Sequence, residues 1–177
     1  MDDDPFTRVY REHLEFVWRL ARSFGVDAAQ LDDLVHEVFM VVRRRLDTRA
    51  PTGTLRAWLA GITRNLVMHH RRGRLREARR IEQVTAPPSP RGPDEVLEQA
   101  EAAALMQRFL DSLDPARREV FALVEIEGLS APEVAQLCDV KLPTVYTRLR
   151  AARAELAAFV ERLRAGELRT RGGPSDG

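Results

Sequence analysis

The chain has 177 residues, which is enough for one domain of average size or two small ones. Its hydrophobic content of 44% is normal for a globular protein, and no apolar run approaches the ~20 residues that span a bilayer. The acidic N-terminus, MDDDPFTR, lacks the apolar segment of a secretory signal, and the single Cys138 excludes an internal disulfide. A cytoplasmic protein in a reducing compartment is therefore expected.

Charge is unevenly distributed along the chain, although the net charge is only +1. The segment 43–80 is rich in arginine, and only Asp47 and Glu77 oppose it. Acidic residues gather instead at the N-terminus, around 32–37 and again from 94 to 127. Such segregation suggests a local site for a polyanion on a protein that is neutral overall. A solvated basic helix face is the alternative, but the density of arginines favours nucleic acid.

Apolar residues at three- and four-residue spacing predict an amphipathic helix from Phe6 to Phe24, which Gly25 ends. Asp27 and Gln30 match a capping box for a second helix over 28–46. This helix has too much apolar surface for a single neighbour, so it should be central.

The sequence DTRAPTGT at 47–54 is a loop by its Pro, Gly and Thr content. A third helix is expected from about Leu55, with fraying in the arginine-rich run before Ile81. Its buried stripe should comprise Trp58, Leu59, Ile62, Leu66 and Met68. These three helices predict a small bundle over 1–84.

The sequence TAPPSPRGP at 85–93 can neither continue a helix nor form a core, so we interpret it as a semi-stiff linker. A second helical domain should follow over 94–165. Asp114 followed by Pro115 predicts a capped helix start within it, with Val120, Phe121, Val124 and Ile126 inside. From 166 to 177 we expect a disordered tail. Strand-like alternation is missing, so the fold class is all-α with two domains.

The stretch 128–153 reads as two helices with a tight break between them. Ser130 and Glu133 form a capping box for the first helix, and Pro143 suits the start of the second. A short capped helix, a turn and a longer helix with a polar, basic outer face are the pattern of a DNA-binding helix-turn-helix. An ordinary helical hairpin is the alternative, which the pattern alone does not exclude. The second helix should bury Val145, Leu149 and Ala152.

Patterns typical of enzymes and metal sites are missing from the sequence. His36-Glu37 has Met40, not a second histidine, at the position that a zinc-protease helix requires. His69 and His70 are neighbours on a helix and point in different directions, and no glycine-rich loop could hold a phosphate. No catalytic residue, metal or cofactor is expected.

Five runs carry a likeness to a known family. They are LDDLVHEVF at 31–39, LRAWL at 55–59, ITRNL at 62–66, LDPARREVF at 113–121 and the stretch 128–153. In order and spacing they resemble regions 2 and 4 of the extracytoplasmic-function sigma factors, over about Phe6 to Leu163. Each run is weak evidence alone, whereas two matched domains in the right order are strong evidence.

The resemblance implies a promoter-specificity subunit of bacterial RNA polymerase that has only the two essential domains. Region 2 would dock on the clamp helices of the largest catalytic subunit and melt the −10 element. Region 4 would bind the −35 duplex and the flap of the neighbouring large subunit. The resemblance also implies a stress or envelope response under an anti-sigma factor, which can hold the protein at the membrane.

Candidates for polymerase docking lie on the second helix. They are Asp32, Asp33, Leu34, His36, Glu37 and Phe39. The carboxylates suit ion pairs with a basic helical partner, and Leu34 and Phe39 are candidate apolar anchors. For the acids, the alternative is a favourable interaction with the N-terminus of their own helix, which contributes ~0.3–1 kcal/mol. His36 stands where the family more often has Gln.

Candidates for DNA contact fall in both domains. For the −10 element they are Arg49, Arg56, Arg64, Asn65, His69, Arg71 and Arg72, because cations and planar groups hold single-stranded bases. For the −35 element they are Lys141, Thr144, Tyr146, Thr147, Arg148, Arg150 and Arg153, because arginine pairs bidentately with guanine. Trp58 could stack on a base, but its spacing favours the core.

Four positions depart from the family pattern. Pro143 stands where Gly is usual, which the first turn of a helix should tolerate. His69 stands where Asp is common, and Tyr146 and Ala151 where basic residues are frequent, and these three leave the base preference open. Two other functions also stay open. One is a stand-alone helix-turn-helix regulator that never touches polymerase, and the other is a protein mainly sequestered by, or acting as a decoy for, an anti-sigma factor.

Overall fold

The computed structural model describes residues 4–49, 53–78 and 97–171, with side chains described as far as 73 in the second range and over 101–166 in the third. All regular structure in these ranges is helical. The elements are α1 (Pro5–Ser23), α2 (Ala28–Arg45), α3 (Leu55–Ala78), α4 (Leu97–Ser112), α5 (Pro115–Phe121), η1 (Ala122–Ile126), α6 (Ala131–Cys138) and α7 (Leu142–Arg171). The all-α prediction is confirmed.

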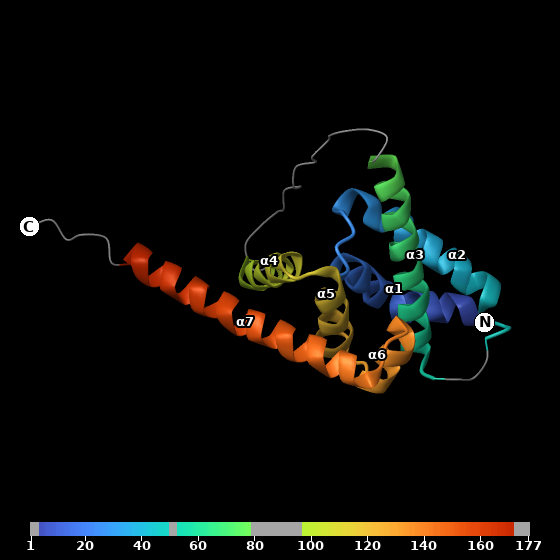
Figure 1. Cartoon of the computed structure of the whole chain (residues 1–177). Helices are drawn as coiled ribbons and strands as arrows, with labels where there is room; N and C mark the ends of the chain where they lie inside the picture. The colour runs from blue at the N-terminus through green and yellow to red at the C-terminus, as the bar shows by residue number, and fades with distance from the viewer. Residues whose placement is uncertain (1–3, 50–52, 79–96, 172–177) are drawn as a thin grey trace, which may run out of the picture.

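Helices α1, α2 and α3 pack on one another and form the first half of the molecule (Figure 1). Helix α2 packs on both α1 and α3, so the predicted contact with more than one neighbour is confirmed, and it buries residues between Leu31 and Val42. Gly25 ends α1 with a φ of +83°, a conformation that costs little only for glycine. The predicted capping box at the start of α2 is wrong, because the side chain of Asp27 makes no cap hydrogen bond.

Helix α3 begins at Leu55, as predicted, and continues into the arginine-rich run as far as Ala78. The end of that run, where fraying was expected, lies outside the described residues. Leu59 and Ile62 are buried as predicted, whereas Met68 is only half-buried and Val67 takes the core position beside it.

Helices α4 to α7 form the second half of the molecule. The Asp114 carboxylate accepts hydrogen bonds from the backbone N–H groups of Ala116 and Arg117, so the predicted helix start is confirmed. The chain then forms a single π-helical turn, η1. This wider turn changes the helical period, so Ala122 and Leu123 are buried, whereas Val124 and Ile126 are only half-buried. The expected burial of the last two residues is corrected accordingly.

The helix-turn-helix is formed by α6, a tight turn and the start of α7. The capping box of Ser130 and Glu133 is complete, with bonds in both directions. Asp139 closes α6 in the left-handed conformation at φ 53°, which Asp tolerates better than most residues. The predicted stripe of α7 is confirmed, since Val145, Leu149 and Ala152 are all buried.

One expectation about a segment end turns out differently, and another cannot be compared with the described residues. Helix α7 continues to Arg171, so residues 166–171 are helical and the expected tail does not begin at 166. The run ELRTR contains strong helix formers and no proline, which accounts for the extension. The predicted linker at 85–93 lies outside the described residues.

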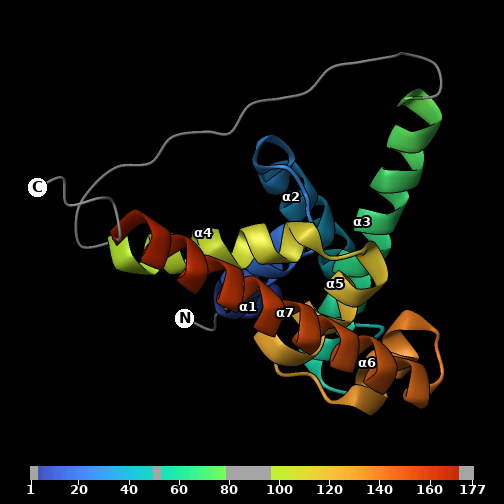
Figure 2. The same cartoon turned by 60° about the vertical axis from the view of Figure 1, so that its left-hand side comes forward.

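The two halves are in direct contact, and their buried residues form one continuous hydrophobic cluster. Helix α6 lies at the foot of α3, and α7 runs from there away from the first half (Figure 1). Turned by 60°, α7 crosses in front of α4 (Figure 2), and the two helices meet where the rings of Phe109 and Phe159 lie 5.7 Å apart. Among the described residues, no helix is both long and apolar enough to cross a membrane.

Candidate nucleic-acid and polymerase interface

Helix α2 presents an acidic face to solvent. Asp32, Asp33, His36 and Glu37 are all exposed. Glu37 also lies 3.0 Å from Nε2 of His70 on α3. We call Asp32, Asp33, His36 and Glu37 the acidic face of α2.

The two apolar anchors expected beside these acids are not on the surface. Leu34 is 1% exposed and Phe39 is 3% exposed, because both belong to the central stripe of α2. The expectation that they anchor a partner is corrected. Met40 is the exposed apolar residue in this segment, with 43% of its surface accessible.

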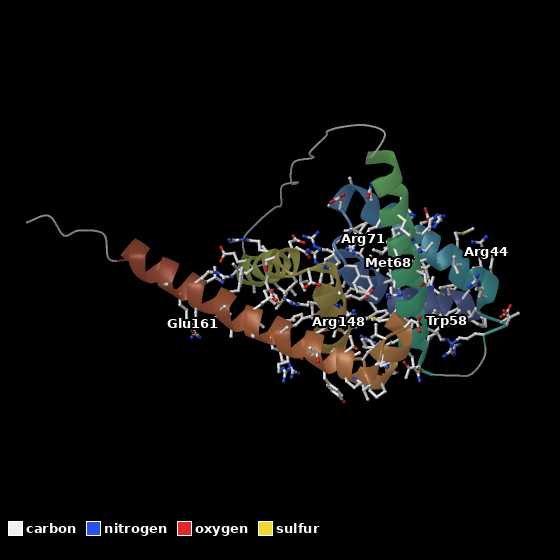
Figure 3. The ribbon with its side chains drawn as sticks, in the orientation of Figure 1. Arg44, Trp58, Met68, Arg71, Arg148 and Glu161 are labelled. Atoms are coloured by element: carbon white, nitrogen blue, oxygen red, sulfur yellow. The ribbon has the colours of Figure 1, made fainter. Side chains whose placement is uncertain are left out.

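The candidate −10 residues on α3 divide between two faces of the helix. Asn65, His69 and Arg72 follow one another at four- and three-residue spacing, and all three are exposed. Arg56, Arg64 and Arg71 lie on the other face. In Figure 3, Arg71 and Met68 lie on the side of α3 that faces α5, and Trp58 lies on the opposite side. The structure therefore does not bring all seven candidates together.

Arg56 is bonded to the second half of the molecule through Glu127. Its Nη2 donates to the Glu127 backbone carbonyl at 3.1 Å and to Oε2 of the same residue at 3.2 Å. Arg19 of α1 approaches from another side and donates to both carboxylate oxygens, at 3.0 and 2.9 Å. The Glu127 side chain has no exposed surface. Its hydrogen bond raises the pKa of Arg19 against the opposing effect of burial.

Arg64 is bonded to the second half through Glu119. Its Nε donates to Oε1 of Glu119 at 2.5 Å, and both side chains are largely buried, at 18% and 10% exposed. Burial acts to lower the pKa of Arg64, but the hydrogen bond and charge of Glu119 outweigh it and the pKa is raised. Cys138 lies beside this pair, and burial followed by the charge of Glu119 raises its pKa to about 12.

A small pocket lies between the halves next to these ion pairs. Its lining includes Met68 and Arg71 from α3 and Pro115 and Arg118 from α5. Arg71 donates to the backbone carbonyl of Phe24. This face of α3 is therefore occupied by the second half of the molecule.

Arg49 and Trp58 form a separate pair beside the loop before α3. The Arg49 guanidinium lies 5.6 Å from the centre of the Trp58 ring and donates to the carbonyl of Gly53 at 2.8 Å. Trp58 is half-buried and packs against the core. The prediction that Trp58 is a core residue therefore holds for the buried part of its side chain, and the rest of the side chain is exposed.

The start of α7 carries the candidate −35 residues. Lys141, Tyr146, Thr147, Arg150 and Arg153 are exposed, whereas Thr144 and Arg148 are half-buried. Tyr146 has 55% of its surface accessible. The hydroxyl of Thr147 donates to the carbonyl of Pro143 at 2.9 Å, and Arg153 donates to Glu125 at 2.9 and 2.5 Å. Tyr146, Thr147, Arg150 and Arg153 share one stripe by their spacing.

Sequence reasoning missed three residues that organise the contact between the halves. They are Arg19, Glu119 and Glu127. The acidic residues of 94–127 contribute to the segregated charge, and Glu119 lies inside a run that resembles region 4. Nothing in the sequence pattern, however, indicates that the carboxylates of Glu119 and Glu127 are buried. A buried charge requires a partner, and only the tertiary structure shows that arginines lie beside these two carboxylates.

Comparison with known proteins accounts for both halves. Residues 9–77 match the family model of sigma-70 region 2, and residues 103–156 match that of sigma-70 region 4. Among curated relatives, the ECF RNA polymerase sigma factor SigE of Mycolicibacterium smegmatis is 35% identical over 153 residues, which are 85% of this chain and 59% of SigE. The chain therefore spans less than two thirds of that relative.

Two further relatives are matched over most of their length. The RNA polymerase sigma factor NccH of Alcaligenes xylosoxydans xylosoxydans is 32% identical, with 90% of this chain and 89% of NccH covered. CnrH of Cupriavidus metallidurans, also an RNA polymerase sigma factor, is 30% identical, with 88% and 86% covered.

Solved structures show the same fold. The sigma factor RpoE of Bartonella quintana, solved with the anti-sigma factor NepR, gives a TM-score of 0.70 at 24% identity, with 88% of this chain and 96% of that chain covered. CnrH, solved with the cytosolic domain of CnrY, gives a TM-score of 0.64 at 28% identity, with 89% and 88% covered. From these matches and the arrangement of its two halves, the chain belongs to the sigma-70 family, among the extracytoplasmic-function RNA polymerase sigma factors.

Proposed function

We propose that this chain binds core RNA polymerase through the acidic face of α2, recognises a two-part promoter and opens it without ATP. The observation that carries the proposal is the match of both halves, in order, to regions 2 and 4 of the family. On this proposal residues 1–84 form the polymerase and −10 domain, 94–165 form the −35 domain, and 85–93 link them. The protein acts as a specificity subunit and performs no chemistry of its own.

The acidic face of α2 supports the docking role by its charge and accessibility. Asp32, Asp33 and Glu37 place three exposed carboxylates within two turns of one helix. Such a surface suits a basic helical partner, because complementary charge steers association and fixes its register. Met40 adds an exposed apolar contact at the end of this segment.

The helix-turn-helix supports the −35 role by its geometry. Its second helix exposes a stripe of tyrosine, threonine and arginine side chains from its first turns, where a recognition helix reads base edges. For the −10 strand, the exposed residues Asn65, His69 and Arg72 offer hydrogen bonds and positive charge to a single strand.

Transcription in vitro with core polymerase tests the function directly. With genomic DNA as template, the purified chain should direct run-off transcription from a limited set of start sites that core polymerase alone does not use. If no promoter in the genome is used, the proposal fails, and DNA binding without polymerase binding would instead indicate a stand-alone regulator.

Charge reversal on α2 tests the docking face. Asp33→Arg with Glu37→Arg should weaken polymerase binding by at least tenfold, because two attractive pairs become repulsive. The matched control reverses two exposed acids elsewhere, Glu12 and Glu161, and should bind polymerase normally. Pull-down and competition with the unmodified chain measure both. Equal loss in the two variants would contradict a specific docking face.

We also propose that an anti-sigma factor keeps this protein inactive until a signal releases it. The support is CnrH, which resembles this chain in sequence and fold and was solved with the cytosolic domain of CnrY. Purification of the tagged chain from its native host should co-purify one stoichiometric protein that inhibits the run-off reaction. Recovery of polymerase subunits alone would contradict this part of the proposal.

A further inference from the structure

We propose that the small pocket between α3 and α5 binds one small inorganic anion of the size of chloride. Arg64 and Arg71 of α3 and Arg118 of α5 line this pocket together with Glu119. None of the lining residues belongs to the acidic face of α2 or to the candidate −35 residues. The anion site does not depend on the proposed function, because the contents of the pocket alone define it.

Positive charge outweighs negative charge in the described lining of this pocket. The ionisable side chains of the lining are three arginines and one carboxylate, that of Glu119. The Glu119 carboxylate is already engaged, since Nε of Arg64 donates to it at 2.5 Å. Asp111 lies 3.3 Å from Nη1 of Arg118 but is not part of the lining, and its side chain is 55% exposed. Even with Asp111 included, positive charge is in excess, which favours an anion.

Arg118 contributes a buried N–H group that has no acceptor. Its side chain is only 14% exposed, and within the described part of the chain its Nε atom is buried without a hydrogen-bond partner. A buried donor without an acceptor is costly, and the cost is greater when the donor belongs to a charged group. An anion in the pocket would accept this N–H and offset the positive charge at the same time.

Two of the guanidinium groups approach each other beside Gly25. A β-carbon at this glycine would lie 2.2 Å from Nη1 of Arg118 and 3.4 Å from Nη2 of Arg71. Both nitrogens therefore reach the same small region, which only a residue without a side chain leaves open. Like charges that lie so close together repel each other, and the repulsion is stronger where burial reduces the screening by water. An anion between the two groups would turn this repulsion into attraction.

The pocket has room for a single small ion. Its cavity volume is about 10 Å³, close to the room that one water molecule needs, and it is partly open to solvent. Met68 and Arg71 lie on the side of α3 that faces α5 (Figure 3), and Val67 and Pro115 add apolar walls. Chloride is little larger than water, whereas phosphate, a tetrahedron of oxygens, exceeds the cavity. Guanidinium groups are weakly hydrated, so they exchange water for a bound anion readily.

Water is the other occupant that would fit this cavity. A water molecule could accept the N–H of Arg118, but it would leave the excess positive charge of the lining in place. Its own hydrogens would also need acceptors, and the lining is dominated by N–H donors. The chemistry of the lining therefore favours an anion over water.

Chloride NMR relaxation tests the site in the full-length protein. Bound chloride relaxes faster than free chloride, so the unmodified chain should broaden the chloride signal in a saturable way. Arg118→Gln keeps a polar side chain but removes the charge, and it should weaken chloride binding by about tenfold, because one charge-assisted hydrogen bond is lost. The matched control, Arg108→Gln, removes an exposed arginine from the same half and should bind chloride like the unmodified chain.

Competition identifies the kind of anion. With glutamate as the replacing anion at constant ionic strength, bromide should displace chloride, whereas phosphate should not. Saturable broadening that is as strong in Arg118→Gln as in the unmodified chain overturns the inference, and so does the absence of saturable broadening in the unmodified chain. Displacement by phosphate as effective as that by bromide overturns the assignment to an anion of chloride size.

Bromide diffraction decides the matter if circular dichroism shows that Arg118→Gln does not fold. Crystals of the unmodified protein soaked in sodium bromide should give an anomalous peak beside Nε of Arg118, on the side of Arg71. Water at this position gives no anomalous signal. A map without a peak there overturns the proposal, even if bromide binds to other arginines.

Discussion

Single side chains determine where the DNA-binding helices begin. At the start of α6 the Ser130 hydroxyl donates to Oε2 of Glu133 at 2.7 Å and accepts from the Glu133 backbone N–H at 3.4 Å. The Ser130 backbone N–H donates to the same carboxylate at 2.9 Å. These bonds lower the pKa of Glu133, the side-chain bond from Ser130 most and its backbone bond next. One residue pair thereby fixes the direction in which α6 leaves the loop.

Ser130→Ala should lower the free energy of unfolding by about 1 kcal/mol near neutral pH, since this is the usual cost of losing an N-cap. The folded-state pKa of Glu133 is depressed from 4.5, so its stabilising contribution is present above that pH and is lost as the pH falls through the lowered value. Urea unfolding from pH 7 to pH 3 should show the difference from the unmodified protein narrowing at the acid end. The same narrowing for Ser130→Ala in a Glu133→Gln background, where residue 133 cannot titrate, would contradict this origin.

Cys138 should be unreactive in the folded protein. Burial raises the pKa of its thiol to about 12, so the thiolate that reacts with disulfide reagents is scarce at neutral pH. Titration with a chromogenic disulfide at pH 8 should be at least a hundredfold slower for the native chain than in denaturant. A fast native reaction would show that the turn between α6 and α7 opens readily.

At the scale of elements, α7 combines the candidate DNA-reading surface with a buried apolar stripe. Its first turns expose Tyr146, Thr147 and Arg150 on one side, while Val145 and Leu149 hold the helix against α5 and α6. Helix α2 divides in the same way, with acids outside and Leu34 and Phe39 inside. In each case the apolar period fixes which polar residues a partner can reach.

Arg150→Ala should weaken binding to promoter DNA and relax base preference at one −35 position, by about 1–3 kcal/mol if the arginine reads a guanine. If it contacts only phosphate, affinity should fall evenly across sequences and the salt slope should drop by about 1. Arg164→Ala, an exposed change farther along the same helix, is the matched control and should bind normally. Fluorescence anisotropy at several salt concentrations separates these outcomes, and normal binding by Arg150→Ala would remove it from the recognition surface.

At the scale of the whole molecule, the proposed function depends on two halves that act at separate DNA elements. A tether between binding modules sets their effective concentration for one another and fails when it cannot span the sites. The length of 85–93 should therefore matter more than its sequence.

Deleting four residues from 85–93 should lower run-off transcription severalfold while leaving binding to an isolated −35 duplex unchanged. Replacing the same four residues by Gly and Ser should be tolerated, which controls for sequence. Deleting Arg171 to Gly177 should leave transcription intact, because the described contacts of region 4 lie before this segment. Full activity of the shortened linker would count against simultaneous binding at two sites.

The amino-acid sequence alone determined the helices, their order and the family. Apolar spacing, Pro115 and the Ser130–Glu133 pair act locally, and local signals of this kind are readable without a fold. Sequence reasoning missed the length of α7 and the register of η1. It also missed the burial of Leu34 and Phe39 on α2, the helix that exposes the acids. These depend on which neighbours cover each face.

Only the tertiary structure decided that Arg56 and Arg64 meet Glu127 and Glu119. Sequence reasoning grouped these arginines with Asn65, His69 and Arg72 as one DNA-binding set, because all lie on a basic segment. The two carboxylates come from the second half, 71 and 55 residues away along the chain, and a charge pattern contains no information about such a contact. A carboxylate that is buried away from solvent is stable only when a cation lies beside it. The packing of the two halves places Arg56 beside Glu127 and Arg64 beside Glu119.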